Sequence, residues 1–191
     1  MRKLAFYDFD STLVESPHPE YGIDDWQEYY GEEYPHIGWW SKPESLDLNV
    51  FEFRTIPKMK QLIKKDLSNP TTYVIVLTAR IESLRPYIER ILKKLSFDVD
   101  ILDMKSDGRN KGEKVLEYIM NNPNIKQVDV YDDNYEREIL SYKSIVDEIP
   151  DGIDFNIYHV SNGMPTKLSE NQIKIKSLVN ETIVQYLQNG K

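Results

Sequence analysis

The sequence contains no cysteine and only three histidines in 191 residues. Without cysteine the chain forms neither a disulfide framework nor a thiolate zinc site, and a cysteine nucleophile is excluded. No apolar run is long enough to cross a membrane. The apolar stretch near the start is broken by Asp8 and Asp10, too early for a secretory signal peptide. We therefore expect a cytoplasmic protein with no membrane partner.

Positive charge is also scarce, since 24 Lys and Arg face 32 Asp and Glu, giving a formal net charge of −8. Binding along an extended duplex needs many cationic contacts with phosphates, so the composition argues against it. A small phosphorylated substrate, or the end of a nucleic acid strand, is still compatible with this charge. Such a ligand needs only a local pocket, where a bound cation can offset the carboxylates.

The remaining pattern alternates between strands and helices. Apolar residues at helical spacing predict helices over residues 59–67 and 84–95. The pairs Asn110/Glu113 and Ser169/Gln172 resemble capping boxes that begin two further helices. Short apolar runs predict buried strands at residues 4–9, 73–77, 99–102, 127–131 and 155–160.

This alternation implies βαβ units and a parallel sheet with helices on both faces. The length fits one domain. We therefore expect residues 1–191 to form a single Rossmann-like α/β domain, a three-layer sandwich with a small cap inserted after the first strand.

The expected cap is the segment 15–54, which separates the first strand from its helix by far more than a usual βα loop. Its aromatic side chains could form a small core of their own, or they could stack on a substrate. The two interpretations are compatible, because different residues can serve each purpose. The segment holds all three tryptophans and four tyrosines: Trp26, Trp39, Trp40, Tyr21, Tyr29, Tyr30 and Tyr34.

Polar residues directly follow three of the predicted strands. In a parallel sheet the carboxyl ends of the strands line the ligand crevice. Each motif alone also suits a turn or a helix cap, but all three together favour one site. Four carboxylates in one crevice need a cation, and oxygen donors without His or Cys suit Mg²⁺. The residues are Asp8, Asp10 and Thr12, then Thr78 and Arg80, then Asp132 and Asp133.

These residues lie in four segments that resemble the motifs of the haloacid dehalogenase superfamily. FYDFDSTL resembles motif I, VIVLTAR motif II, NKGEKVLEYI motif III and VDVYDDN motif IV. The resemblance extends from about residue 3 to about residue 140. Within the superfamily, SPHP and GWW followed by a proline resemble the domain found in Swiss Army Knife RNA-repair proteins. Asn134 departs from that subgroup, which tends to have arginine there, and Glu138 stands near the place of its histidine.

The resemblance implies a phosphatase that works through an aspartyl-phosphate. Asp8 would be the nucleophile, kept ionised by the metal, and Asp10 the general acid and base, kept protonated by its surroundings. Thr78 would bind a phosphoryl oxygen, and a lysine would neutralise the charge of the transferring group. We expect that lysine to be Lys111, at the start of a capped helix, with Lys114 as the alternative.

The same resemblance implies that Mg²⁺ is held by Asp8, the backbone carbonyl of Asp10, and Asp132 or Asp133. For the substrate we expect a nucleotide or a nucleic-acid-end phosphate, as in a nucleotidase or a polynucleotide phosphatase of RNA repair. The alternatives are a phosphatase of sugar or other metabolite phosphates, a dehalogenase, and a binding module without catalysis. A dehalogenase would need neither Asp10 nor the Asp132–Asp133 pair. The expected substrate-binding residues are Thr12, Arg80, Trp39 and Trp40.

Overall fold

A six-stranded sheet with the order β5-β4-β1-β6-β7-β8 forms the centre of the computed structural model, which describes residues 2–173. The neighbours among the first five strands are parallel, and β8 pairs with β7 in the antiparallel direction. The predicted α/β class is confirmed, and a strand is found at each of the five predicted places. The strands are β1 (Arg2–Tyr7), β4 (Thr72–Ile81), β5 (Ile101–Lys105), β6 (Ile125–Asp132), β7 (Asp154–Ser161) and β8 (Met164–Lys167).

Strand β8 has no counterpart in the sequence-based prediction. It follows β7 through a tight turn in which Asn162 and Gly163 have φ angles of 50° and 72°. Such turns match the right-handed twist of a hairpin. The strand lies at the edge of the sheet and is largely exposed, so it contains no apolar run, and Pro165 is tolerated there.

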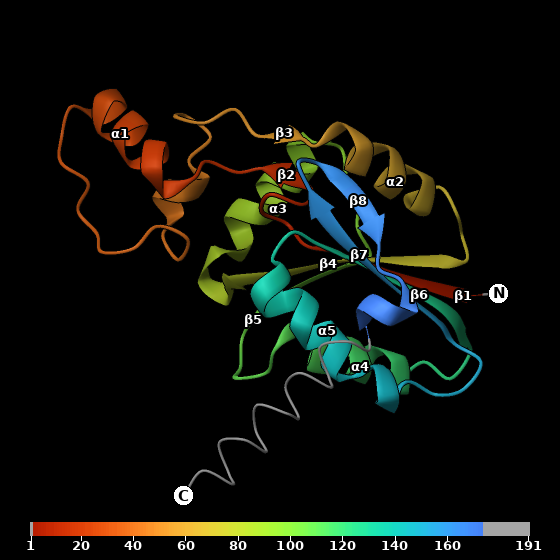
Figure 1. Cartoon of the computed structure of the whole chain (residues 1–191). Helices are drawn as coiled ribbons and strands as arrows, with labels where there is room; N and C mark the ends of the chain where they lie inside the picture. Colours follow the sequence, from red (N-terminus) through yellow and green to blue (C-terminus); the bar gives the residue numbers. More distant parts are fainter. Residues whose placement is uncertain (1, 174–191) are drawn as a thin grey trace, which may run out of the picture.

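Helices cover both faces of the sheet (Figure 1). Helices α2 (Pro57–Leu67) and α3 (Arg85–Lys94) lie on one face, and α4 (Lys111–Met120) and α5 (Leu140–Ser144) on the other. The side chains of β1 alternate between the two layers, because successive residues of a strand point to opposite faces. Ala5 and Tyr7 belong to the core under α2 and α3, whereas Leu4 and Phe6 belong to the core under α4.

Both predicted capping boxes are present. The side chain of Asn110 accepts a hydrogen bond from the backbone of Glu113, and the Glu113 side chain accepts one from the Asn110 backbone. Ser169 and Gln172 exchange the equivalent bonds, at 3.3 and 2.9 Å. The later residues predicted for that last helix, Leu178 to Leu187, lie outside the described range.

Strand β4 is longer than predicted. It runs to Ile81, so Thr78 and Arg80 lie inside it and do not follow it. Its pairing with β5 shifts register between Leu77 and Ile81, and this irregularity marks the place where the polar residues begin. Short helical turns not predicted from sequence are η2 (Glu82–Leu84), the π-helical η3 (Tyr135–Ile139) and η4 (Val146–Glu148).

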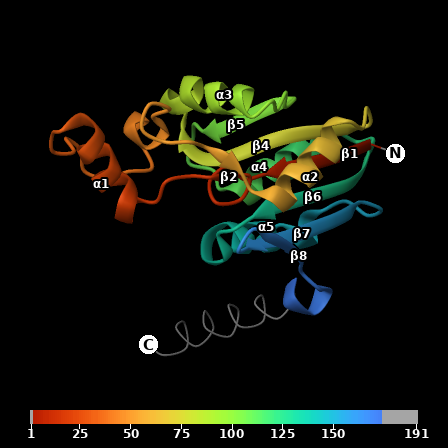
Figure 2. The ribbon, with the colours of Figure 1, turned by 90° about the horizontal axis from the view of Figure 1, so that it is seen from above.

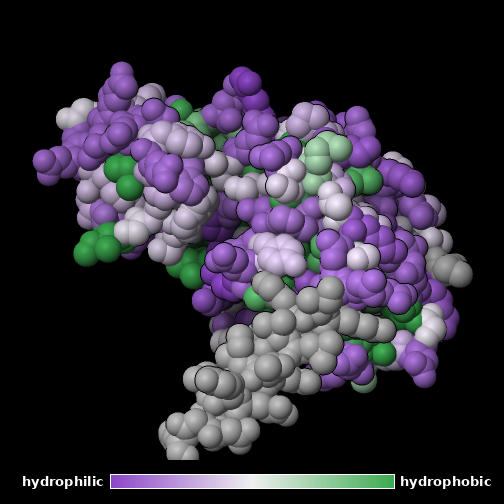
Figure 3. Space-filling model, in the orientation of Figure 1, coloured by the Kyte–Doolittle hydropathy of each residue, from purple (hydrophilic) through white to green (hydrophobic). Residues whose placement is uncertain are grey.

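The segment 15–54 leaves the body through a two-stranded antiparallel ribbon, β2 (Val14–Glu15) with β3 (Arg54–Thr55), in which Glu15 pairs with Arg54. Between them it forms α1 (Pro19–Tyr30) and the turn η1 (Pro43–Leu46). It projects from one end of the sheet (Figure 2). A hollow separates it from the body in the space-filling view (Figure 3).

Two of the tryptophans form the interior of this segment. Trp26 and Trp39 are buried, and the indole nitrogen of Trp39 donates to the carbonyl oxygen of Pro17 at 2.7 Å. Gly22 is required beside it, because a Cβ there would lie 2.6 Å from the Trp39 ring. The inserted segment therefore has an aromatic core of its own.

Across the described residues, no helix is both long and apolar enough to cross a bilayer.

Candidate active site

The carboxyl ends of β1, β4 and β6 meet around a cavity of about 320 Å³. The neighbouring positions of these strands in the sheet bring their polar residues together, as the sequence pattern predicts. The inserted segment contributes one wall through Trp40. The predicted residues that line the cavity are Asp8, Asp10, Trp40, Thr78, Arg80, Lys111, Asp132 and Asp133.

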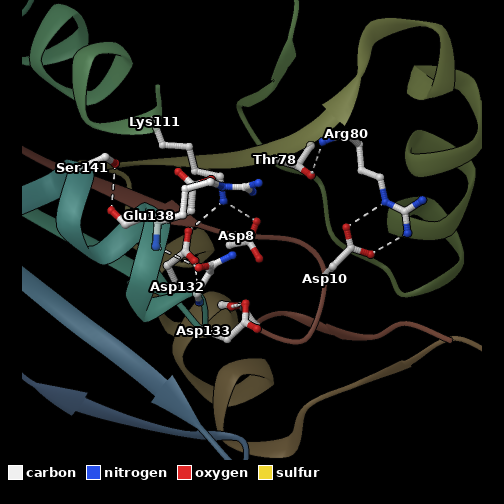
Figure 4. Close-up of polar contacts among 12 residues, drawn as sticks. Asp8, Asp10, Thr78, Arg80, Lys111, Asp132, Asp133, Glu138 and Ser141 are labelled. Atoms are coloured by element: carbon white, nitrogen blue, oxygen red, sulfur yellow. Dashed lines mark hydrogen bonds and ion pairs between the residues drawn. The ribbon is translucent and has the colours of Figure 1, made fainter. Parts of the chain in front are cut away.

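Lys111 lies between two of the carboxylates (Figure 4). Its Nζ is 2.5 Å from Asp8 Oδ1 and 2.7 Å from Asp132 Oδ2, and all three side chains are buried. Burial by itself would lower the pKa of the Lys111 ammonium, but the charges of Asp132 and Asp8 outweigh it and the net shift is upward. Lys111 is therefore a fixed positive charge beside Asp8.

Helix α4 places Lys111 there because it begins at that residue, directly after the capping box. Gly112 allows the close approach of this helix to α5, since a Cβ would lie 2.2 Å from the carbonyl oxygen of Ser141. Lys114, one turn later, donates to Asp103 and to the backbone of Met104. Of the two alternatives, the structure therefore brings Lys111, and not Lys114, to Asp8.

Three carboxylates can hold a metal ion together. Oxygen atoms of Asp8, Asp132 and Asp133 all lie within 4.8 Å of one another. Oxygens on opposite sides of a Mg²⁺ ion are about 4.2 Å apart, since each lies about 2.1 Å from the metal. The donor set therefore fits a hard divalent cation after a small adjustment. The Asp10 carboxylate is not part of this group.

The electrostatics of the carboxylates also favour a cation. Burial raises the pKa of Asp8, and Asp132 raises it further while Lys111 opposes the shift. Burial also raises the pKa of Asp133, again with Asp132 as a contributor and with the Thr12 hydroxyl, which donates to it at 3.2 Å, opposing. One ammonium group does not neutralise two buried carboxylates and the half-buried Asp133, so a divalent ion would stabilise their ionised forms.

Asp10 points away from Asp8 and toward Arg80 (Figure 4). Both of its oxygens accept hydrogen bonds at 2.8 Å, from Nε and Nη2 of Arg80. Nη1 of Arg80 donates to the carbonyl oxygen of Trp40 and to Ser45 Oγ, at 2.7 and 2.5 Å. The guanidinium also lies 4.9 Å from the Trp40 ring centre. Arg80 thus joins Asp10 to the inserted segment.

This arrangement differs from the predicted one in two ways. A guanidinium has five N–H groups, and protein partners engage four of those of Arg80, which leaves little donor capacity for a substrate phosphate. Both oxygens of Asp10 are occupied by Arg80, whereas a general acid must present its carboxyl group to the leaving oxygen. The pair must therefore open before Asp10 can protonate a leaving group.

Two of the expected substrate-binding residues do not reach the cavity surface. Trp39 is 3% exposed and packs inside the inserted segment, and Thr12 is fully buried beneath Asp133. Trp40 is 37% exposed and lines the cavity. Of the adjacent tryptophans, only Trp40 can offer a ring face to a ligand.

Sequence reasoning assigned no role to Arg137 and Glu138, which also line the cavity. Glu138 is buried and accepts a hydrogen bond from Nε of Arg137. They are placed there by the π-helical turn that follows Asp133, whose start is capped by the Asn134 side chain. The available signals were their position a few residues after the Asp132–Asp133 pair and, for Glu138, its place near that of the subgroup's histidine.

No family model and no curated protein sequence matches the chain. Among solved structures, one similar chain belongs to the Pnkp1/Rnl/Hen1 RNA repair complex, with a TM-score of 0.51 and 16% identity over 84% of this chain. A second is a Thermotoga maritima protein assigned as a beta-phosphoglucomutase, with a TM-score of 0.51 and 16% identity over 93% of this chain. The fold is that of the haloacid dehalogenase superfamily.

This chain spans 43% of the RNA-repair chain and 91% of the Thermotoga protein. At this level of identity the likeness shows the haloacid dehalogenase fold alone. Chemically, the site offers a carboxylate next to a buried ammonium, a possible cation site and an adjoining cavity. A carboxylate nucleophile beside a fixed positive charge suits the transfer of a negatively charged group, because the positive charge stabilises the negative charge of the transition state.

Proposed function

We propose that the chain is a Mg²⁺-dependent phosphate monoester hydrolase that uses Asp8 as its nucleophile. The observation that supports this most strongly is the buried Asp8–Lys111–Asp132 cluster, with Asp133 beside it at the rim of a cavity. Mg²⁺, bound by Asp8, Asp132 and Asp133, would neutralise charge on the phosphoryl oxygens. We further propose that Asp10 contributes its backbone carbonyl.

The reaction has two half-reactions. An oxygen of Asp8 attacks phosphorus, and the bond from phosphorus to the leaving oxygen breaks, giving an aspartyl-phosphate. Water then attacks the same phosphorus, releasing inorganic phosphate and restoring the Asp8 carboxylate. Lys111 stabilises the phosphoryl charge in both steps, and the hydroxyl of Thr78 binds one phosphoryl oxygen.

Asp10 would exchange protons with the leaving oxygen and with the attacking water. Because its carboxylate is paired with Arg80 in this structure, we propose that substrate binding between Trp40 and the body opens the pair. Arg80 is then a positioning residue. Until the substrate binds, it fixes Asp10 and the inserted segment relative to each other, and it does not clamp the phosphate.

We propose a nucleotide, or the phosphorylated end of a nucleic acid strand, as the substrate. The support is the half-exposed ring of Trp40 in the cavity wall, because stacking on an aromatic side chain contributes about 1–3 kcal/mol per base and tolerates any base. The likeness to a chain of an RNA repair complex is consistent with this substrate class.

A substrate panel with and without Mg²⁺ tests the proposal. It comprises an aryl phosphate, nucleoside monophosphates, 3′- and 5′-phosphorylated oligonucleotides, sugar phosphates and a phosphoserine peptide. We expect EDTA to abolish hydrolysis, Mg²⁺ to restore it, and nucleotide substrates to give the highest kcat/KM. A wide advantage for sugar phosphates would refute the substrate class while leaving the chemistry intact.

The two adjacent tryptophans provide the matched pair for this test. Trp40→Ala should lower kcat/KM for nucleotides by about 5- to 160-fold relative to the aryl phosphate, which corresponds to the loss of stacking with one base. Trp39→Ala should instead lower the free energy of unfolding by about 3–5 kcal/mol, as expected for a buried tryptophan. Equal effects of Trp40→Ala on all substrates would mean that its ring does not stack on a base.

A further inference from the structure

A second cavity, of about 230 Å³, adjoins the candidate active site on the side away from the inserted segment. None of its lining residues comes from segment 15–54. It is bounded by the loop between β5 and α4, the start of α4, and Arg137. The two cavities share Thr78, Ala79, Lys111, Arg137 and Glu138, so they adjoin across these residues.

The charge of this second cavity is opposite to that of the chain. Five of its eleven lining residues are Lys or Arg and only one, Glu138, is acidic, whereas the whole chain has 24 basic and 32 acidic residues. We call it the basic cavity. It is lined by Lys105, Arg109, Lys111, Lys114 and Arg137 together with Asn110, Glu138 and apolar or small residues.

The five cations are not equally available to a ligand. Lys111 and Lys114 are buried in ion pairs, and Arg109 is paired with Asp107 and Glu117.

Two cations remain with free donors. Lys105 is exposed and forms no ion pair or side-chain hydrogen bond within residues 2–173. Arg137 uses its Nε for Glu138, and its two terminal nitrogens have no hydrogen-bond partner in the same range. Free donors are therefore concentrated at Lys105, which has no carboxylate partner within residues 2–173, and at the terminal nitrogens of Arg137, whose charge is paired with Glu138.

Hydrogen bonds hold the loop between Lys105 and helix α4. The Asp107 side chain accepts a hydrogen bond from the backbone of Arg109 at 3.0 Å, and the Asn110 capping box follows directly. A fixed loop holds the cationic walls without the entropic cost of ordering them on binding. A solvated surface lysine would be the ordinary interpretation of Lys105 alone, but it does not account for the convergence of cations on a cavity joined to the proposed phosphoryl site.

We propose that the basic cavity binds a second phosphate group of the substrate, next to the one that is hydrolysed. The inference rests on the proposed function, and it deepens that function by defining the preferred substrates. Lys and Arg bind phosphate through charge-assisted hydrogen bonds. The phosphodiester next to a terminal phosphate supplies this second group, whereas a nucleoside monophosphate lacks it. A local basic cavity also explains how an acidic chain can bind a strand end without a basic track.

The test compares one charge reversal with a matched control. Lys105→Glu alters a residue that lines only the basic cavity, and Lys126→Glu makes the same change at an exposed lysine at the start of β6. The substrates are an aryl phosphate, a nucleoside monophosphate, a dinucleotide with a terminal phosphate and a hexose bisphosphate.

We expect the unaltered protein to prefer the phosphorylated dinucleotide over the nucleoside monophosphate. Lys105→Glu should lower kcat/KM for the dinucleotide by about 10-fold or more, as expected for a lost charge-assisted contact. It should also reduce the salt dependence of that kcat/KM by about one unit of slope. Hydrolysis of the aryl phosphate should be unchanged, and Lys126→Glu should resemble the unaltered protein on every substrate.

The inference is overturned if Lys105→Glu affects substrates with one and two phosphates equally, or has no more effect than Lys126→Glu. A preference for the hexose bisphosphate, lost in Lys105→Glu, would support the second phosphate site and refute the strand-end substrate. Absence of Mg²⁺-dependent hydrolysis of any substrate would refute the proposed function. In that case, calorimetry with a nucleoside 3′,5′-bisphosphate would test the basic cavity separately. The inference requires the Lys105→Glu variant to bind this ligand more weakly than the unaltered protein does.

Discussion

Two lysines in this molecule each lie between two buried aspartates, at opposite ends of β1. Beyond the carboxyl end, Lys111 contacts Asp8 and Asp132 at 2.5 and 2.7 Å. Near the amino end, Lys3 contacts Asp66 at 2.9 Å and Asp129 at 2.7 Å. The two clusters have the same composition, but their surroundings differ.

The cluster at Lys3 is closed and its acceptors are satisfied. The hydroxyl of Tyr7 donates to Asp66 at 2.7 Å, and the side-chain amide of Asn156 donates to Asp129 at 2.8 Å. The rings of Tyr7, Tyr131 and Tyr158 stack beside it, with centres 4.8 and 4.6 Å apart. Because donors surround its carboxylates, this cluster needs no further ligand and stabilises the fold.

The cluster at Lys111 opens to a cavity and includes a third carboxylate, Asp133, within 4.8 Å of the others. It has an excess of negative charge and an accessible side. An Asp–Lys–Asp group occurs in this molecule in both a closed and an open surrounding, so that composition alone does not identify an active site. An open cavity and an uncompensated charge make the difference, and the following experiments test that distinction.

The largest difference is expected between two Asp→Asn variants. Asp8→Asn should lose turnover by several orders of magnitude, because it removes the nucleophile and a proposed metal ligand together. Asp129→Asn should keep kcat per folded molecule and lower the free energy of unfolding, measured by urea denaturation. Substantial turnover by Asp8→Asn, with deamidation excluded by mass spectrometry, would refute the mechanism.

Substitutions of the two lysines should differ in the same way as the two Asp→Asn variants, with smaller effects. Lys111→Met should lower kcat by about 10²–10³-fold, the usual cost of one charge-stabilising donor, and Lys114→Met should cost far less activity. Lys3→Met should lower the free energy of unfolding by about 3–5 kcal/mol, because two buried carboxylates lose their partner. Loss of activity in folded Lys3→Met would contradict the structural role of its cluster.

Arg80 is another buried cation, and it belongs to neither cluster. If it positions Asp10, Arg80→Met should lower kcat for alkyl phosphates, whose leaving groups need protonation, by up to about 10²-fold. Aryl phosphates, which leave readily, should be affected much less. A rise in KM of similar size for both substrate classes would instead indicate that Arg80 binds the phosphate.

The smallest effect concerns pH and stability. Burial lowers the pKa of Lys3, but Asp129 and Asp66 outweigh it, and the net shift is upward from 10.5. The folded protein therefore binds this proton more tightly than the unfolded chain, so its contribution is complete below pH 10.5 and is lost as the pH rises above it. The difference in unfolding free energy between the unaltered protein and Lys3→Met should shrink over that alkaline range. A constant difference would show that Lys3 acts through packing alone.

The sequence by itself determined the places of five strands, the capping boxes and the polar residues that meet at the site, but not where β4 ends. Asp8, Thr78 and Asp132 were found because each lies at the end of an apolar run. The apolar run and the polar residue are neighbours in the sequence, so this signal is local. The start of α4 at Lys111 was found because a capping box involves residues only three apart. The parallel direction of the strands then follows from general rules for βαβ units, whereas their order in the sheet came from the structure.

Only the tertiary structure decided between neighbours of the same type. Trp39 and Trp40 are adjacent, yet one fills the inserted segment and the other faces the cavity. Arg80 faces Asp10, 70 positions earlier in the chain, and Lys3 faces Asp66, 63 positions later. Contacts over such separations depend on how strands and helices pack together, and no local pattern encodes them. The strand β8 was missed because it is exposed and therefore has no apolar run. Its backbone pairing with β7 makes it a strand, and the sequence pattern does not show that pairing.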